Sequence, residues 1–195
     1  MKLPLSDGKL LVKLARHAIE TYFSGKIISM PEADKFTDKR GVFVTLSELE
    51  ELRGCIGFPE PVYALKRAII ESARAAAFKD PRFAPVTEDE LDEISVEISV
   101  LTNPELIEVE KPEEYLDKIK IGEHGLIIRS MYSSGLLLPV VAVEEKWTPL
   151  DFLKHTCIKA GLDKDAWQEE ETKIYSFMSQ VFAEEEPNGK IVLKM

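Results

Sequence analysis

Cysteine and the side-chain amides are the residues that this chain has least of. Cys55 and Cys157 are the only cysteines, too few for the disulfide framework of a small secreted domain or to form a zinc site by themselves. Asparagine and glutamine occur only at positions 103, 168, 180 and 188. Thermophile proteins lose these thermolabile amides, so we expect a hot-growing archaeon or bacterium as the source. A Cys55–Cys157 disulfide inside such a cell would be less unusual than elsewhere.

Long apolar runs and an excess of basic residues are also missing. No apolar stretch reaches the about 18 residues of a membrane-spanning helix. The segment MKLPLSDGKLL lacks the apolar core and cleavage site of a secretory signal, so a cytoplasmic location is expected. The net charge of −10 argues against broad nucleic-acid binding, which depends on many contacts between basic side chains and phosphate. A local basic pocket is compatible with that charge.

The sequence fingerprints of common enzyme classes are absent. There is no Walker loop, no dinucleotide-binding GxGxxG, no nucleophile-elbow serine and no CxxC. ATPase, dehydrogenase and hydrolase templates are therefore unsupported, and no cofactor is predicted. Histidine, cysteine and carboxylate residues do not recur at ligand spacing, so no metal site is predicted.

Three longer segments have the pattern of helices, and EEYLDKI (113–119) is expected to form a short one. Apolar residues recur at helical spacing over 9–23, and Gly25 stands where a C-cap glycine belongs. Residues 62–79 form an alanine-dense helix whose small side chains let it pack closely on a sheet. The third helix lies within 148–161, with Thr148 as its N-cap.

Strand patterns alternate with these helices without a regular βαβ order. The β-rich runs 41–46 and 52–58 predict a hairpin with a longer loop, and 94–101 alternates cleanly between apolar and polar residues. Further strands are expected at 125–130, at 136–139, and as two strands around a Pro-Asn-Gly turn after residue 173. This mixture indicates an α+β fold with mainly antiparallel sheet.

The segment ELRGCIGFPEP (51–61) carries the strongest candidate site. Strand alternation divides its residues between two faces. The face expected to pack on the core carries Leu52, Gly54, Ile56 and Phe58. The other face carries Arg53, Cys55 and Gly57.

Two interpretations of this segment stand side by side. In the first, Arg53 lies one pleat, roughly 6–7 Å, from Cys55 and favours its thiolate. Gly54 and Gly57 then leave room for a ligand or another backbone, and Arg82 adds charge for an anion. In the second, Cys55 is a small hydrophobe packed in the fold.

Two histidines are candidate general bases for Cys55. His155 shares a helix face with Asp151 but not with Cys157, which lies on a core stripe. An Asp–His pair could orient a base, although a surface ion pair is the more frequent arrangement. His124, flanked by glycines, is first a turn residue and second a catalytic candidate.

Several blocks of this sequence together resemble the AMMECR-type family. They are LRGCIG (52–57), KDPRFAPVTEDEL (79–91), ISVEISVLTNPELI (94–107), GEHGLIIR (122–129) and LPVVAVEEKWTPLDFLKHTCIKAG (138–161). The resemblance covers nearly the whole chain from residue 40 onward and is most specific at LRGCIG. It implies a single domain over residues 1–195 with two unequal lobes, each built on an antiparallel sheet. Both termini would lie in the larger lobe, and the smaller lobe would be inserted in the middle of the chain.

The resemblance implies no settled activity, but it suggests partners. Bacterial and archaeal relatives are fused to, or encoded with, a Memo-like protein and a radical S-adenosylmethionine enzyme. The family's hallmark block falls on residues 52–57, and its second block includes Asp80 and Arg82. His155 and Cys157 match the helix found in prokaryotic members.

Three function hypotheses follow. The first is a Cys-dependent enzyme or enzyme subunit acting on a small anionic ligand, with Cys55 as nucleophile, Arg53 and Arg82 as ligand-binding residues, and His155 or His124 as base. The second, with equal support, is a binding module for a partner, in which the thiol is incidental. The third and weakest is a nucleic-acid-linked regulator, which would need a basic face large enough to outweigh the charge of −10.

Overall fold

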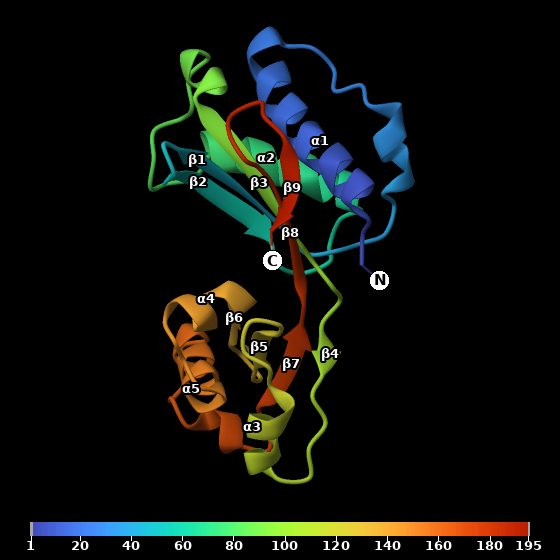
Figure 1. Ribbon diagram of the computed structural model, residues 1–195. Coiled ribbons are helices and arrows are strands. Elements are labelled where there is room, and N and C mark those ends of the chain that lie inside the picture. The colour runs from blue at the N-terminus through green and yellow to red at the C-terminus, as the bar shows by residue number, and fades with distance from the viewer. Residues whose placement is uncertain (1, 195) are drawn as a thin grey trace. The chain divides into compact units, whose positions relative to one another are not determined.

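The computed structural model describes residues 2–194, and the chain divides into two compact units (Figure 1). The first unit comprises Met1–Leu101 and Gln180–Met195, and the second comprises Thr102–Ser179. One antiparallel sheet flanked by helices lies at the centre of each unit, with five strands in the first and four in the second. The α+β fold predicted from the sequence is therefore confirmed.

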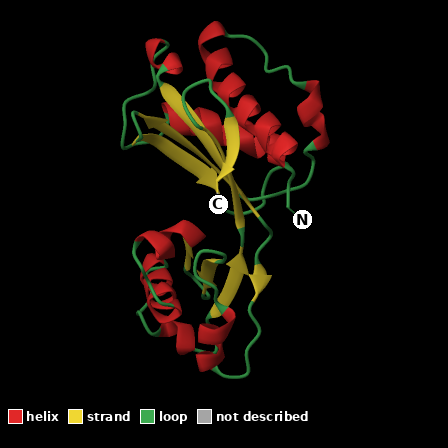
Figure 2. Ribbon diagram, viewed as in Figure 1, coloured by secondary structure: helices red, strands yellow, loops and turns green. Residues whose placement is uncertain are grey.

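Two long helices cover one face of the five-stranded sheet (Figure 2). Helix α1 (Leu5–Ser24) ends at Gly25, whose φ of +63° is the left-handed C-cap conformation expected there. Helix α2 (Leu65–Phe78) packs against the first two strands, with its buried alanines facing them. Two short 3-10 helices, η1 (Pro31–Lys35) and η2 (Asp89–Asp92), lie in the connections.

The five-stranded sheet has the order β2-β1-β3-β8-β9. Its strands are β1 (Val42–Glu48), β2 (Glu51–Phe58), β3 (Ile94–Leu101), β8 (Ser179–Glu184) and β9 (Ile191–Lys194). The prediction for 94–101 is confirmed, and every second residue of this strand from Ile94 onward is buried. Because β2 is at the edge of the sheet, only one side of it pairs with a strand.

The hairpin between β1 and β2 is tighter than the sequence predicts. Both strands continue into the expected loop, and only Leu49 and Glu50 remain as the turn. Their φ values of 50° and 67° are those of a type I′ turn, whose twist matches the strands on either side. The prediction of a longer loop is wrong, because neither Leu49 nor Glu50 is the Asn or Gly that normally marks such a turn.

A β-bulge interrupts the same hairpin. Leu46 pairs with Gly54 and Ser47 pairs with Leu52, so Arg53 is an extra residue without a partner on β1. Beyond the bulge the side chains change faces, and Leu52 lies with Ser47 away from the helices. The expectation that Leu52 faces the core is therefore wrong, and this residue is 43% exposed.

The second unit contains a sheet of order β4-β7-β5-β6 and a set of short helices. Its strands are β4 (Glu105–Leu106), β5 (Gly125–Arg129), β6 (Ser134–Leu137) and β7 (Lys173–Phe177). Its helices are η3 (Pro112–Glu114), α3 (Tyr115–Lys118), α4 (Pro139–Glu144), α5 (Pro149–Lys159) and η4 (Ala166–Gln168). Thr148 caps α5 in a reciprocal capping box with Asp151, as its sequence indicates.

One predicted strand is in fact two. The run that begins at residue 173 ends its first strand, β7, at Phe177, and β8 begins at Ser179. The two strands belong to different sheets because the chain passes from the second unit back to the first at this point. Within residues 2–194 no helix has the length and apolarity needed to cross a bilayer.

Candidate functional site

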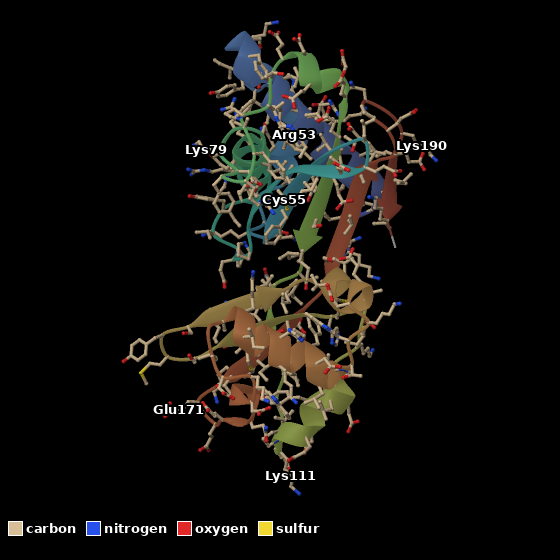
Figure 3. All side chains as sticks on the ribbon, turned by 90° about the vertical axis from the view of Figure 1, so that its left-hand side faces the viewer. Arg53, Cys55, Lys79, Lys111, Glu171 and Lys190 are labelled. Atoms are coloured by element: carbon tan, nitrogen blue, oxygen red, sulfur yellow. The ribbon has the colours of Figure 1, made fainter. Side chains whose placement is uncertain are left out.

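Cys55 lies near the middle of the edge strand β2 and pairs with Thr45 of β1 (Figure 3). Its backbone N–H and C=O do not face β1, because both bond to other groups on the outer side of the strand. Cys55 and Thr45 are therefore a non-hydrogen-bonded pair, the kind whose side chains lie closer together. Accordingly, the Thr45 hydroxyl donates to the half-buried Cys55 Sγ across 3.3 Å.

Asp80 and Arg82 take the place of a neighbouring strand beside Cys55. Asp80 Oδ2 accepts from the Cys55 N–H at 2.9 Å, and Arg82 Nη2 donates to the Cys55 carbonyl at 3.2 Å. Arg82 also grips Asp80 with two guanidinium nitrogens, Nε at 3.0 Å and Nη2 at 2.7 Å. These bonds hold the pKa of the buried Asp80 well below its usual range, and the same carboxylate raises the pKa of Arg82.

Arg53 is engaged in a second ion pair on the same strand. Its Nε and Nη2 donate to the two oxygens of Glu90 at 2.6 and 3.2 Å, and its Nη1 donates to the Ala84 carbonyl at 2.9 Å. The hydrogen bonds from Arg53, with others from Thr87, lower the pKa of Glu90 to about 2. Arg53 therefore fastens the segment after α2 to the bulge of β2, and its charge is neutralised there.

The two glycines of the segment make room for the protein's own atoms. A Cβ on Gly54 would lie 2.3 Å from the Ala76 carbonyl oxygen, so this glycine lets the backbone of α2 approach the strand. A Cβ on Gly57 would lie 2.2 Å from the Val42 carbonyl oxygen and 2.5 Å from the Phe43 ring. Of the two uses expected for the glycines, Gly54 thus serves another backbone. The binding of a ligand at either glycine stays a prediction.

The sheet face that carries the Cys55 thiol is the one opposite α1 and α2. We call it the Cys55 face. We use the name for the part that lies on β1, β2 and β3, which the strand register gives as Phe43, Thr45, Ser47, Leu52, Cys55, Gly57, Ser95, Glu97 and Ser99. Among these residues Glu97 is the ionised one, and it accepts from Lys194 of β9 at 2.6 Å, so the two charges cancel. The face is therefore mixed in polarity and nearly neutral in charge.

The candidate bases lie in the second unit. His155 is on α5, where its ring stacks on Trp147 with centroids 4.0 Å apart. Asp151, the expected orienting partner, instead accepts two hydrogen bonds from Thr148 at the start of that helix. His124 accepts from the Lys120 N–H at 3.4 Å in a turn. A role for either histidine as base for Cys55 stays a prediction.

The second cysteine is a core residue, as its helical stripe predicts. Cys157 is fully buried beside Phe152 and Leu153. Burial raises the pKa of its thiol to about 11. Both cysteines are free thiols, and within residues 2–194 no three His, Cys, Asp or Glu side chains gather in a way that could hold a metal ion.

Sequence reasoning missed two partners of Cys55. Thr45 was assigned only to a strand, although the alternation of 41–46 puts it on the face opposite Val44 and Leu46. Asp80 was named only as part of the family's second block and not as the acceptor for the N–H of Cys55, which lies 25 residues earlier in the chain. The signal available was the Asp-Pro-Arg spacing, which permits one arginine to bond a carboxylate two residues before it.

Comparison with known proteins gives a consistent result. The AMMECR1 family model matches residues 12–182. A protein of Methanopyrus kandleri is 51% identical over 195 residues, covering 97% of this chain and 94% of the relative. A protein of Methanocaldococcus jannaschii is 52% identical over 197 residues, with 98% and 97% covered. A crystal structure of a Pyrococcus horikoshii protein superimposes with a TM-score of 0.85 at 50% identity, covering 96% of both chains. The chain belongs to the AMMECR1 family.

Proposed function

We propose that this AMMECR1-family protein is a recognition module that binds a partner protein through the Cys55 face. The observation that carries the proposal is the state of the two arginines. Arg53 and Arg82 each make a two-pronged ion pair with a carboxylate of the segment that follows α2. An anion would have to displace those carboxylates to be bound by either guanidinium in the same way.

The surroundings of the thiol also favour recognition over nucleophilic catalysis. A nucleophilic cysteine is activated by a nearby base or by cationic neighbours. Within the described part of the first unit, the side chain hydrogen-bonded to the Cys55 thiol is that of Thr45, whose hydroxyl is not a base at neutral pH. His17, the histidine of this unit, lies on α1 beside Glu20. The Cys55 face has few charged side chains, and few charged side chains are also typical of the centre of a protein–protein interface.

We take the partner from the family's gene associations. A Memo-like protein and a radical S-adenosylmethionine enzyme are the two candidates. Binding of either one through the Cys55 face would make the chain a subunit that positions or regulates an enzyme.

The test introduces a negative charge on the Cys55 face and compares its effect on partner binding with that of the same substitution in the second unit. Leu52 is on the Cys55 face and 43% exposed, while Leu106 is in the second unit and 45% exposed. With the two candidate partners from the same organism, we expect Leu52→Glu to weaken binding by about tenfold or more, because the partner would then cover an unpaired carboxylate. Leu106→Glu and Cys55→Ser should bind like wild type in titration calorimetry. Equal effects of the two leucine variants, or no binding of the wild-type chain, would refute the proposal.

A Cys-dependent enzyme is the second candidate, and one observation favours it. The Arg82 side chain is 54% exposed while it touches the Cys55 carbonyl, so part of this guanidinium faces solvent near the thiol. In that case a small anion such as phosphate should protect Cys55 from iodoacetamide. Cys55→Ser should then fail to restore function in a deletion strain. Under the recognition proposal the same variant restores it.

A further inference from the structure

The four-stranded sheet of the second unit ends in an open edge. Strand β6 is last in the order β4-β7-β5-β6, so only its side toward β5 pairs with a strand. An open edge readily pairs with a further strand, and folded proteins usually prevent this with charged side chains, proline, bulges, very short strands or a covering segment. These features therefore show which edges are protected from pairing.

The other three edge strands each have such a feature. The backbone of Cys55 on β2 is covered by Asp80 and Arg82. Strand β4 has only two residues, and β9 has Lys190 before it and Lys194 at its end. Strand β6, with the sequence SGLL, has four residues and contains no charge, proline or bulge. Within residues 2–194, β6 is thus the edge strand that lacks the protections found on the other three.

The strand register shows which backbone groups of β6 face its open side. At the end of the β5–β6 hairpin, the Ser130 N–H donates to the Ser133 carbonyl at 2.9 Å, which makes these two residues a hydrogen-bonded pair. Counting along the register from that pair, Gly135 bonds toward β5, whereas Ser134 and Leu136 belong to non-hydrogen-bonded pairs. The N–H and C=O groups of Ser134 and Leu136 therefore point away from β5. In the part of the chain that the structure describes, no protein group bonds to them.

The segment around β6 carries no charge. Residues 130–143, SMYSSGLLLPVVAV, form the longest run in the sequence without a charged side chain, although 31% of all residues are charged. Two copies of the chain, each with a net charge of −10, repel one another. A contact between two copies is therefore most favourable where the surface is neutral, and the edge at β6 meets this condition.

Exposed apolar side chains stand on both sides of β6 in the sequence. Met131 and Tyr132 of the preceding turn are 72% and 92% exposed, and Val140 and Val143 of the following helix α4 are 50% and 51% exposed. In an antiparallel pair, the residues before one strand lie opposite the residues after the other. Two copies of β6 paired in this way would bring the apolar turn of each copy beside the apolar start of α4 in the other.

We propose that two copies of this chain associate through β6, antiparallel and about a two-fold axis. Ser134 of each copy exchanges backbone hydrogen bonds with Leu136 of the other, so the groups that point away from β5 are satisfied by the same groups of the second copy. Gly135 then lies opposite its own counterpart on the axis, where the two backbones approach most closely and a side chain would be in the way. The two four-stranded sheets become one continuous sheet.

The first test measures association of the full-length protein. A strand pair with two apolar flanks is smaller than a standard interface of about 1,600 Å², so we expect a weak dimer with a Kd of about 10–500 µM. In sedimentation equilibrium the mass should rise from the 22.0 kDa of the single chain toward twice that value by about 1 mM protein. In the same range, hydrogen exchange of the Ser134 and Leu136 amides should slow. A monomer at 1 mM, or a dimer in which these amides stay unprotected, would refute the proposal.

A proline on the edge separates strand pairing from other modes of contact. Ser134→Pro removes one outward N–H from each copy and leaves the bonds between β5 and β6 in place, because the Ser134 N–H does not face β5. We expect the dimer to weaken by about tenfold or more, since two hydrogen bonds are lost per dimer. Ser134→Ala, which keeps the N–H, should associate like wild type. Wild-type association of Ser134→Pro with an unchanged circular dichroism spectrum would overturn the pairing of β6.

A charge in the turn tests the apolar flanks. Tyr132→Glu should weaken the dimer by about tenfold, because the carboxylate would be placed against the apolar start of α4 in the second copy. Ile27→Glu is the matched control, because Ile27 is 90% exposed in the first unit and its replacement adds the same charge. Equal weakening by the two variants would mean that net charge alone controls association, and the assignment to β6 would then be wrong.

Discussion

Replacement of Asp80 by asparagine is the sharpest test of the structural account of Cys55. The Asp80 side chain is 2% exposed, and its two oxygens accept four hydrogen bonds. Three of these come from Arg82 and one from the Cys55 N–H. An asparagine keeps one acceptor oxygen and turns an NH₂ group toward donors, so at least one backbone or guanidinium N–H loses its partner.

The expected loss of stability depends on how far Asp80 and Arg82 are each buried. Removing one member of a buried ion pair costs about 3–5 kcal/mol, but Arg82 is 54% exposed and water can solvate it after the change. Discounting for that exposure, we expect Asp80→Asn to lower the free energy of unfolding of the first unit by about 2–3 kcal/mol. The control is Asp34→Asn, because Asp34 pairs with Lys66 at 2.5 Å but is 70% exposed. That surface pair should contribute less than about 0.5 kcal/mol.

The pH dependence gives a second, independent measurement. Folding lowers the pKa of Asp80, so its contribution is complete above the unfolded-state pKa of about 3.9 and is lost as the pH falls toward the folded-state value. In urea titrations followed by circular dichroism, the gap between wild type and Asp80→Asn should be the same at pH 7 and pH 5. It should shrink below about pH 4. If Asp80→Asn costs no more than Asp34→Asn, the carboxylate does not hold β2 as described.

Three further outcomes are expected. Native protein treated with iodoacetamide near pH 7.5 should be alkylated at Cys55 but not at Cys157, because a pKa of about 11 leaves Cys157 almost no thiolate. Peptide mass spectrometry identifies the alkylated residues, and equal labelling of the two cysteines would contradict the burial of Cys157. Gly54→Ala should destabilise the folded protein by about 3 kcal/mol or more, because the new methyl group would collide with the backbone carbonyl of Ala76. A midpoint of urea unfolding near that of wild type would disprove the close approach of α2 to the strand. Glu90→Gln should lower the free energy of unfolding by about 1–2 kcal/mol at pH 7 and by clearly less near pH 2. The pKa of Glu90 is lowered to about 2 in the folded protein, so its ion pair with Arg53 stabilises the fold only while the carboxyl group is ionised. A loss of stability that does not depend on pH would argue against this ion pair.

The sequence predicts those parts of the fold that local signals control. Gly25 ends α1 and Thr148 caps α5, because a positive φ and a capping hydroxyl are properties of single residues. Strand β3 has the bounds that its alternation predicts. The turn at Leu49–Glu50 and the break at Met178 were missed, since neither residue type announces them and both depend on how strands pair.

For the candidate site, the sequence predicts which face of the strand carries Cys55 but not which residues contact it. Periodicity puts Cys55 on a strand face away from the core, and the register agrees. The period is broken by the bulge at Arg53, which depends on pairing with β1, so Leu52 was assigned to the wrong face. The partner of Cys55, Asp80, lies 25 residues away and is reached only after α2 has turned the chain back toward β2.

The hallmark segment now has a structural reason for most of its residues. Arg53 fastens the following segment to the strand, Gly54 admits α2, and Gly57 leaves space for a ring on β1. The backbone of Cys55 is covered by Asp80 and its arginine partner, which protects an edge strand from pairing with another chain. None of these tasks requires a thiol, and a serine side chain would fit the same place. Cys55→Ser leaves these backbone contacts in place and removes only the thiol, which is why this variant distinguishes the two proposed functions.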